Sequence, residues 1–257
     1  MSKKRPTKLY RVLRWMLFTV YPRTRAEGTE NLPDEPVIIV GNHAQMHGPI
    51  VCEFYSPMER YTWCAAQMMH LREVPAYAYQ DFWSQKPRYS RPFYKLLSYI
   101  IAPLASCIFQ NANTIGVYHD ARVVTTFKHT VTHLQAGDSV VIFPEHDVPY
   151  NHVLSDFQNR FIDVAKLYYK KTGKEICFVP LYVAPSLKAM YYGKPIRFCA
   201  DTPLPEERER IRRYLMEEIT AIACALPRHK VVPYRNIGRR KYPYNKDEVN
   251  HHETSGR

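Results

Sequence analysis

The chain has 257 residues, of which 46% are hydrophobic and 23% are charged. These fractions are close to the averages for globular proteins and exclude wholesale disorder, collagen-like repeats and a coiled coil. The length predicts one large domain or two small ones. The six cysteines form no C-x-x-C pair and no secretory leader precedes them, so we expect buried, reduced thiols in the cytosol.

The net charge of +12 is concentrated at the two ends of the chain. Residues 1–25 carry eight Lys/Arg and no acid, residues 228–241 carry six and no acid, and residues 26–227 have a net charge of −1. Basic ends favour a polyanionic partner, either nucleic acid or the anionic surface of a membrane. No nucleic-acid recognition motif is present, so the membrane is favoured over nucleic acid.

The first basic end, residues 1–25, has the pattern of an amphipathic helix. In KLYRVLRWMLFTVY, apolar side chains recur at helical spacing, with Lys8, Arg11 and Arg14 on the other side, and Pro22 ends the segment. A basic face, an apolar face and flanking aromatic rings are typical of a helix lying in a bilayer surface. The alternative is a terminal helix docked on the protein's own core.

No segment is predicted to cross the membrane. The longest apolar run, residues 96–109, has 14 residues and contains Pro103. A spanning helix needs about 20 residues. We therefore expect peripheral attachment to the inner, cytoplasmic face of the membrane.

Between the basic ends, short β-branched runs alternate with helical patterns. The predicted strands are residues 37–40, 139–143, 176–179 and 195–198, and the predicted helices are residues 120–136, 156–171 and 205–226. This alternation predicts one α/β domain over residues 26–227, with a largely parallel sheet flanked by helices. The polar, basic residues 228–257 are predicted to form a disordered tail.

Reactive side chains follow two of the predicted strands. Residues 37–40 run into Asn42 and His43, and residues 139–143 run into Glu145, His146 and Asp147. In an open α/β sheet, chemistry gathers at the carboxyl ends of the strands. A neutral histidine meeting a carboxylate there would be a general base with an orienting acid. Taken separately, such a histidine is more often structural and such an acid is more often solvated surface.

Four segments, taken in order, resemble the four conserved blocks of the glycerolipid acyltransferase family, whose best-known members are lysophosphatidic acid acyltransferases. They are EGTENLPDEPVIIVGNH (27–43), IGVYHDAR (115–122), VVIFPEHD (140–147) and ICFVPLYVAP (176–185). The resemblance covers roughly residues 25–200. It implies an α/β enzyme that moves a fatty acyl chain from acyl-CoA or acyl carrier protein to a lysophospholipid or polyol hydroxyl. These thioesters are co-substrates, and no other cofactor is implied.

The resemblance also assigns roles to residues. His43 matches the family's base, which deprotonates the acceptor hydroxyl, but the acid expected five positions later is replaced by Gly48. Glu145 matches the third block and by resemblance touches the acceptor hydroxyl or helps to build the site. The substrate-binding residues implied are Asn42, Arg122 for the acceptor phosphate, His146, and Pro180 near the acyl chain.

Loss of the orienting acid leaves two interpretations open. Disabling the equivalent aspartate in a serine protease costs roughly 10⁴ in turnover, so another carboxylate must substitute or the protein is slow. The candidates are Asp147, Glu145 and Glu53, and Asp147 is favoured because it follows a strand expected to neighbour the first. The alternative is a catalytically dead, lipid-binding relative of the family.

A metal enzyme is a third, weaker hypothesis. His43 with His47, and His129 with His133, are each separated by four residues, as in paired metal ligands. The H-E-x-x-H pattern of zinc proteases is absent, so we expect no bound metal. The expected partners are a lipid acceptor, an acyl thioester and an anionic membrane surface, while the oligomeric state is left open.

Overall fold

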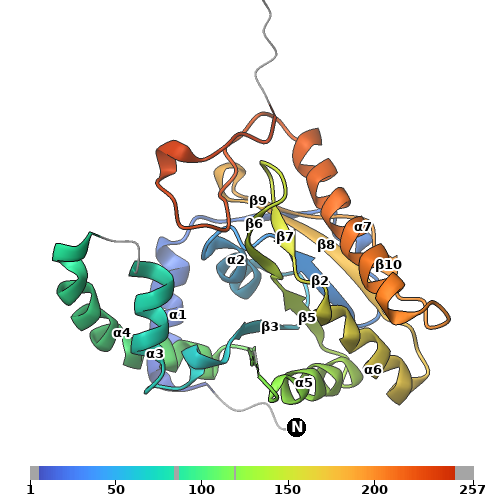
Figure 1. Cartoon of the computed structure of the whole chain (residues 1–257), viewed down its shortest axis with the longest axis horizontal. Coiled ribbons are helices and arrows are strands. Elements are labelled where there is room, and N and C mark those ends of the chain that lie inside the picture. The colour runs from blue at the N-terminus through green and yellow to red at the C-terminus, as the bar shows by residue number, and fades with distance from the viewer. Residues whose placement is uncertain (1–5, 84–86, 119, 247–257) are drawn as a thin grey trace, which may run out of the picture.

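The computed structural model describes residues 6–83, 87–118 and 120–246. At its centre lies a mixed, mostly parallel sheet flanked by helices (Figure 1). The strand order is β1-β9-β8-β2-β5-β3-β4, with β10 antiparallel to β8. The expected α/β class is therefore confirmed. The strands are β1 (Arg25–Glu27), β2 (Val37–Gly41), β3 (Arg60–Ala65), β4 (Thr114–Val117), β5 (Ser139–Ile142), β8 (Cys177–Ala184), β9 (Ala189–Tyr192) and β10 (Ile196–Arg197).

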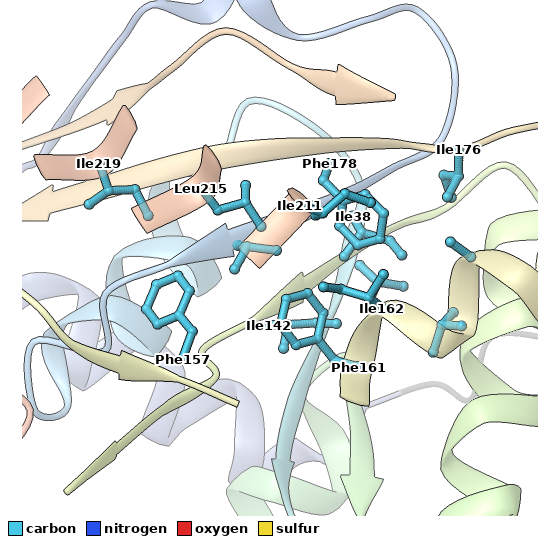
Figure 2. Close-up of a cluster of buried hydrophobic side chains, with 14 of the residues drawn as sticks. Ile38, Ile142, Phe157, Phe161, Ile162, Ile176, Phe178, Ile211, Leu215 and Ile219 are labelled. Carbon is cyan, nitrogen blue, oxygen red and sulfur yellow. The ribbon is translucent and has the colours of Figure 1, made fainter. Parts of the chain in front are cut away.

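Helices cover both faces of this sheet. On one face lie α5 (Val123–Gln135), α6 (Asp163–Thr172) and α7 (Leu204–Ala225), which supply much of the larger hydrophobic core (Figure 2). On the other face lies α2 (His47–Tyr55). The helices α1 (Lys8–Val20), α3 (Val74–Ala78) and α4 (Arg91–Asn111) gather at the edge of the sheet formed by β3 and β4 (Figure 1).

The central strand β2 shows why its sequence is continuously apolar. All five of its residues are buried. Ile38 and Val40 belong to the core beneath α5–α7, whereas Val37 and Ile39 belong to the core beneath α2. Because successive side chains point to opposite faces and both faces are covered, no polar alternation is possible.

A small hairpin departs from the prediction. Residues 156–171 were expected to be one helix, but β6 (Glu145–Pro149) pairs with β7 (Ser155–Phe157), and α6 begins only at Asp163. Phe157 and Phe161 nevertheless both enter the larger core.

Residues 228–246, which we name the C-terminal strap, correct the expectation of a disordered tail over that range. Asn245 is fully buried, and its side chain accepts from the backbone of His229 at 2.8 Å and donates to Ala223 O at 2.7 Å. Val231 and Val232 are also buried. These few anchors hold a segment whose average composition is polar. Residues 247–257 lie outside the described part of the chain.

The helix α1 is attached through its polar side. Tyr10 Oη and Arg14 Nε both donate to Glu53 on α2, at 3.0 and 3.3 Å. Tyr10 is buried, and Phe18 packs against Phe54 and Tyr55 of α2. Much of the apolar stripe is nevertheless exposed: Leu9, Val12, Trp15, Met16, Leu17, Phe18 and Val20. The alternative interpretation, a terminal helix docked on the protein itself, therefore holds for the side of α1 that carries Tyr10 and Phe18, whereas the membrane-surface interpretation stays a prediction.

The helix α4 also exposes apolar side chains: Phe93, Leu96, Tyr99, Ile100 and Leu104. Residues 88–111 form a helical stretch of 24 residues that by length and composition could cross a membrane. The prediction that no segment is long enough is wrong, because Pro103 removes a main-chain hydrogen bond without ending the helix. All six cysteines are free. The expectation that they are buried holds for Cys52 and Cys177, whereas three are partly exposed and Cys224 is exposed.

Candidate active site

The chain leaves the end of β2 along a path fixed by Asn42. Its side-chain amide donates to Val183 O at 3.0 Å and its oxygen accepts from Val183 N at 2.6 Å, so the side chain extends the pairing of β2 with β8. Asn42 is 1% exposed. Its part is therefore to direct the main chain into His43, and its amide is not presented to a substrate.

Glu145 connects the ends of two neighbouring strands. One carboxylate oxygen accepts from His43 N at 2.5 Å and the other accepts from Ser155 N at 2.9 Å. The side chain is 4% exposed, and burial raises its pKa to about 7, opposed by these two backbone donors. Both oxygens are occupied by main-chain groups. Glu145 thus fixes the position of His43 and the base of the β6–β7 hairpin.

Two aromatic side chains lie against the ring of His43. The rings of Phe143 and Tyr234 approach it edge-on, with centroid distances of 5.4 and 5.8 Å and interplanar angles of 71° and 88°. Within the described residues, Nδ1 is buried and has no hydrogen-bond partner. Burial lowers the pKa of His43 to about 4, with a smaller opposing effect from the Gln45 backbone. The imidazole is therefore neutral at pH 7.

Gly48 leaves no space for the acid that the resemblance places there. A Cβ atom at this position would lie 2.7 Å from His43 O, 2.8 Å from a ring carbon of Phe143 and 2.9 Å from Asn42 O. Gly48 N also donates to His43 O at 3.0 Å. The first turn of α2 is therefore packed directly on the loop that carries the base.

The other candidate acids do not reach the ring either. Asp147 has a side chain that is 77% exposed and lies 3.8 Å from Arg235 Nε. The hairpin leaves the main sheet, and along β6 Glu145 is buried whereas Asp147, Val148 and Pro149 are exposed. Glu53 is engaged by α1 and by Arg60, at 3.0 Å. The expectation that Asp147 orients His43 is thus corrected.

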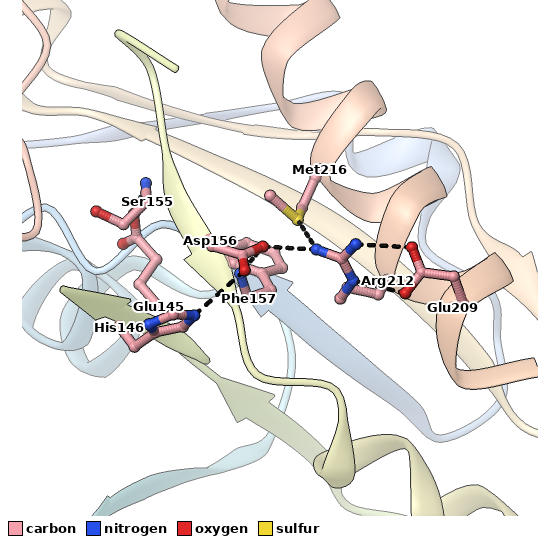
Figure 3. Close-up of polar contacts among 8 residues, drawn as sticks. All are labelled: Glu145, His146, Ser155, Asp156, Phe157, Glu209, Arg212 and Met216. Carbon is pink, nitrogen blue, oxygen red and sulfur yellow. Dashed lines mark hydrogen bonds and ion pairs between the residues drawn. The ribbon is translucent and has the colours of Figure 1, made fainter. Parts of the chain in front are cut away.

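His146 belongs to a polar network between the hairpin and α7 (Figure 3). Its Nε2 lies 3.3 Å from Asp156 Oδ2, while Asp156 Oδ1 accepts from Arg212 at 2.5 Å. Arg212 also donates to Glu209 at 2.7 Å. These contacts tie the hairpin to α7, and none of them involves His43.

Two further predicted residues lie on other strands or at their ends. Arg122 pairs with Asp120 at 2.7 Å and covers the ring of Tyr118, at the end of β4. This strand is three positions from β2, or about 14 Å at the usual strand spacing. Pro180 is buried inside β8, opposite Val40.

This geometry can be set beside known proteins. No family model and no curated protein matches the sequence. A solved structure described as the 1-acyl-sn-glycerophosphate (LPA) acyltransferase, PlsC, from Thermotoga maritima aligns with 84% of this chain and 77% of its own chain. The identity is 15% and the TM-score is 0.44. A likeness at this level does not bear on the function of the chain.

The members of each predicted histidine pair lie in different surroundings. His47 Nδ1 lies 2.6 Å from the hydroxyl of Tyr21, and His43 precedes the helix on which His47 lies. On α5, His133 stacks on a tyrosine of β3, whereas His129 is exposed. Among the described residues, no group of three or more His, Cys, Asp or Glu side chains could hold a metal ion.

The sequence analysis missed the contribution of the C-terminal strap. Tyr234 contacts the base, Tyr242 Oη donates to Gln45 Oε1 at 3.2 Å, and Gln45 Nε2 donates to Arg235 O at 3.3 Å. The positive charge of Arg239 contributes to lowering the pKa of His47 after the larger effect of burial. Tyrosines recurring in an otherwise basic, polar segment were the available signal.

Proposed function

We propose that the chain is an acyltransferase in which His43 is the general base and a thioester, acyl-CoA or acyl carrier protein, is the donor. The acceptor is the hydroxyl of a lysophospholipid or polyol. The observation that carries this proposal is the contact between buried Glu145 and the main chain of His43, since it joins the first and third blocks of the resemblance at one sheet edge. No metal or other cofactor is part of the proposal.

The proposed reaction needs one mobile proton. The acceptor oxygen attacks the thioester carbonyl while its proton passes to His43, and the C–S bond then breaks as the thiolate recovers that proton. A pKa of about 4 keeps His43 unprotonated at pH 7, so it can accept a proton. The same low pKa makes its imidazolium form about 3 kcal/mol less stable than that of a free histidine. A weak base with an unpartnered Nδ1 predicts slow turnover.

The proposed location is the cytoplasmic face of an anionic membrane. Support comes from the exposed apolar side chains of α1 and α4, together with exposed basic residues on the same helices such as Lys8, Arg11 and Arg91. Helices that combine such side chains bind bilayer surfaces by apolar burial and by attraction to anionic lipids. A lipid acceptor would then be drawn from the bilayer.

One observation favours a second candidate, a lipid-binding relative without activity. Nδ1 of His43 lacks any partner among the described residues, and the packing around Gly48 excludes an acid there. A site under selection for turnover would be expected to orient its base with a hydrogen bond.

An activity screen distinguishes the two candidates. Purified protein is given labelled acyl-CoA or acyl-carrier protein together with a lipid extract, and product ester is measured for wild type, His43→Ala and His129→Ala. The enzyme hypothesis requires ester formation that His43→Ala abolishes and that the exposed control His129→Ala retains. Ester formation that survives His43→Ala would refute the assigned base, and lipid binding without ester would favour the second candidate.

A further inference from the structure

The C-terminal strap is closed at its base and reaches back over the loop after β2 (Figure 1). Its two ends are joined by the bridge between Lys230 and Tyr244 and by the bond from Val231 N to Pro243 O at 2.9 Å. His229, next to this closure, bonds the buried hydroxyl of Tyr182 on β8 at 2.7 Å. The intervening residues, 232–242, therefore form a compact loop fixed to the sheet.

This loop holds a strained part of the candidate site. Ala44 and Gln45, which follow His43, both have positive φ angles, of 46° and 56°. Such conformations in non-glycine residues persist only where surrounding contacts impose them. Both ends of the Gln45 amide are bonded to the strap, through Tyr242 Oη and Arg235 O. The strap thus imposes the path of the chain next to His43.

The same loop contacts the imidazole itself. Tyr234 lies edge-on to His43, and Phe143 also approaches the ring edge-on from the end of β5. Edge-to-face contacts fix the orientation of a ring without a hydrogen bond. Because Gly48 leaves no room for an acid, aromatic packing and the neighbouring Gln45 backbone are the contacts that can orient this base.

We propose that Tyr234 is a positioning residue that, through the strap, holds the imidazole of His43 in the orientation that acyl transfer needs. The role takes the place of the orienting acid that the chain lacks. It rests on the proposed function for its catalytic consequence, but the placement of the ring can be measured without any turnover.

The test compares Tyr234→Ala with Tyr234→Phe and with Ile237→Ala, an exposed strap residue that serves as the control. The His43 resonance is identified by its loss in His43→Ala, and its titration is followed by NMR. In Tyr234→Ala, water reaches the ring, so the pKa of His43 should rise from about 4 by about one unit or more. Ile237→Ala should leave it unchanged, and Tyr234→Phe, which keeps the aromatic ring, should shift it less than Tyr234→Ala does.

Turnover supplies a second readout. In Tyr234→Ala, kcat should fall by about 10- to 100-fold with little change in KM, since loss of alignment acts on the chemical step. Tyr234→Phe, which keeps the ring that contacts His43, should lose less kcat than Tyr234→Ala does. If Tyr234→Ala does not fold, Tyr242→Phe, which removes only the hydroxyl bonded to Gln45, should shift the titration in the same direction by a smaller amount.

The outcomes are separable. If wild type is inactive but the titration shifts as expected, the placement of the ring by Tyr234 stands and the proposed function fails. If wild type is active and folded Tyr234→Ala keeps both its kcat and the His43 titration, the positioning role is refuted. For the fallback variant, an unchanged titration in folded Tyr242→Phe would likewise refute it.

Discussion

Substitution of Gly48 tests directly how tightly α2 packs on the loop that carries His43. A Cβ at this position would meet three atoms at 2.7–2.9 Å, whereas ordinary contacts begin at 3.4 Å. Two of the three are carbonyl oxygens, in Asn42 and His43, and the Glu145 carboxylate fixes the backbone of His43. The two carbonyl groups and the Phe143 ring would have to move by about half an ångström, and the tight packing around them opposes this movement.

The expected magnitude follows from two opposing effects. Overpacking by one methyl group costs about 1–3 kcal/mol, while replacing glycine by alanine in a helix gains up to about 1 kcal/mol. Gly48→Ala should therefore lose about 1–2 kcal/mol of unfolding free energy, or about 2–8 °C in Tm for a chain of this size. Gly48→Asp also buries a carboxylate without a partner and should lose about 3 kcal/mol or more.

Thermal and urea unfolding followed by circular dichroism measure this loss, with Gly238→Ala as the control because nothing lies within 4 Å of its Cβ. The control should match wild type. Equal stability of Gly48→Ala and Gly238→Ala would contradict the reasoning, and so would higher turnover in Gly48→Asp, since that acid would then have found a place beside His43.

Three further outcomes are expected. Folding raises the pKa of Glu145 from its usual 4.5 to about 7, so the unfolding free energy of wild type relative to Glu145→Gln, measured by urea unfolding, should fall by about 3 kcal/mol as pH rises through this range. The lowered pKa of His43 makes stability rise with pH below 6.5, but it does so in both proteins and cancels in the comparison. In vesicle sedimentation, Met16→Glu should weaken binding to anionic vesicles, whereas Val124→Glu on the exposed face of α5 should not; equal loss in both would exclude a specific role for α1. Asn245→Ala should lower the unfolding free energy by about 2–3 kcal/mol, because buried backbone groups lose their partners, and an unchanged Tm would show that these bonds do not hold the strap.

The sequence predicted the central architecture well because the core strands are continuously apolar. The run at residues 37–40 is buried on both faces, and its neighbour at residues 139–142 has the same character, so their pairing and the adjacency of His43 and Glu145 could be anticipated. The helix expected from residue 156 failed at its start because residues 155–157 pair across a hairpin, which is a non-local contact that periodicity does not record.

The candidate site was harder to predict because its remaining parts come from distant segments. Asp147 was favoured from its position after a strand, but its exposure depends on how the hairpin leaves the sheet. Tyr234 lies in a segment whose composition indicates disorder, and the order there depends on single buried groups such as Asn245. The average composition of a segment does not reveal that one buried residue, such as Asn245, keeps it ordered.

The strap also constrains when the site can be completed. His43 and Tyr234 are separated by most of the chain, and the closure of the strap depends on Asn245, which is synthesised after every strand of the sheet. Because domains begin to fold as they emerge from the ribosome, the sheet can assemble around β2 while the strap is still missing. A nascent or C-terminally cleaved chain would then carry His43 in a relaxed loop, so folding of the sheet and completion of the site would be separate events in the life of the protein.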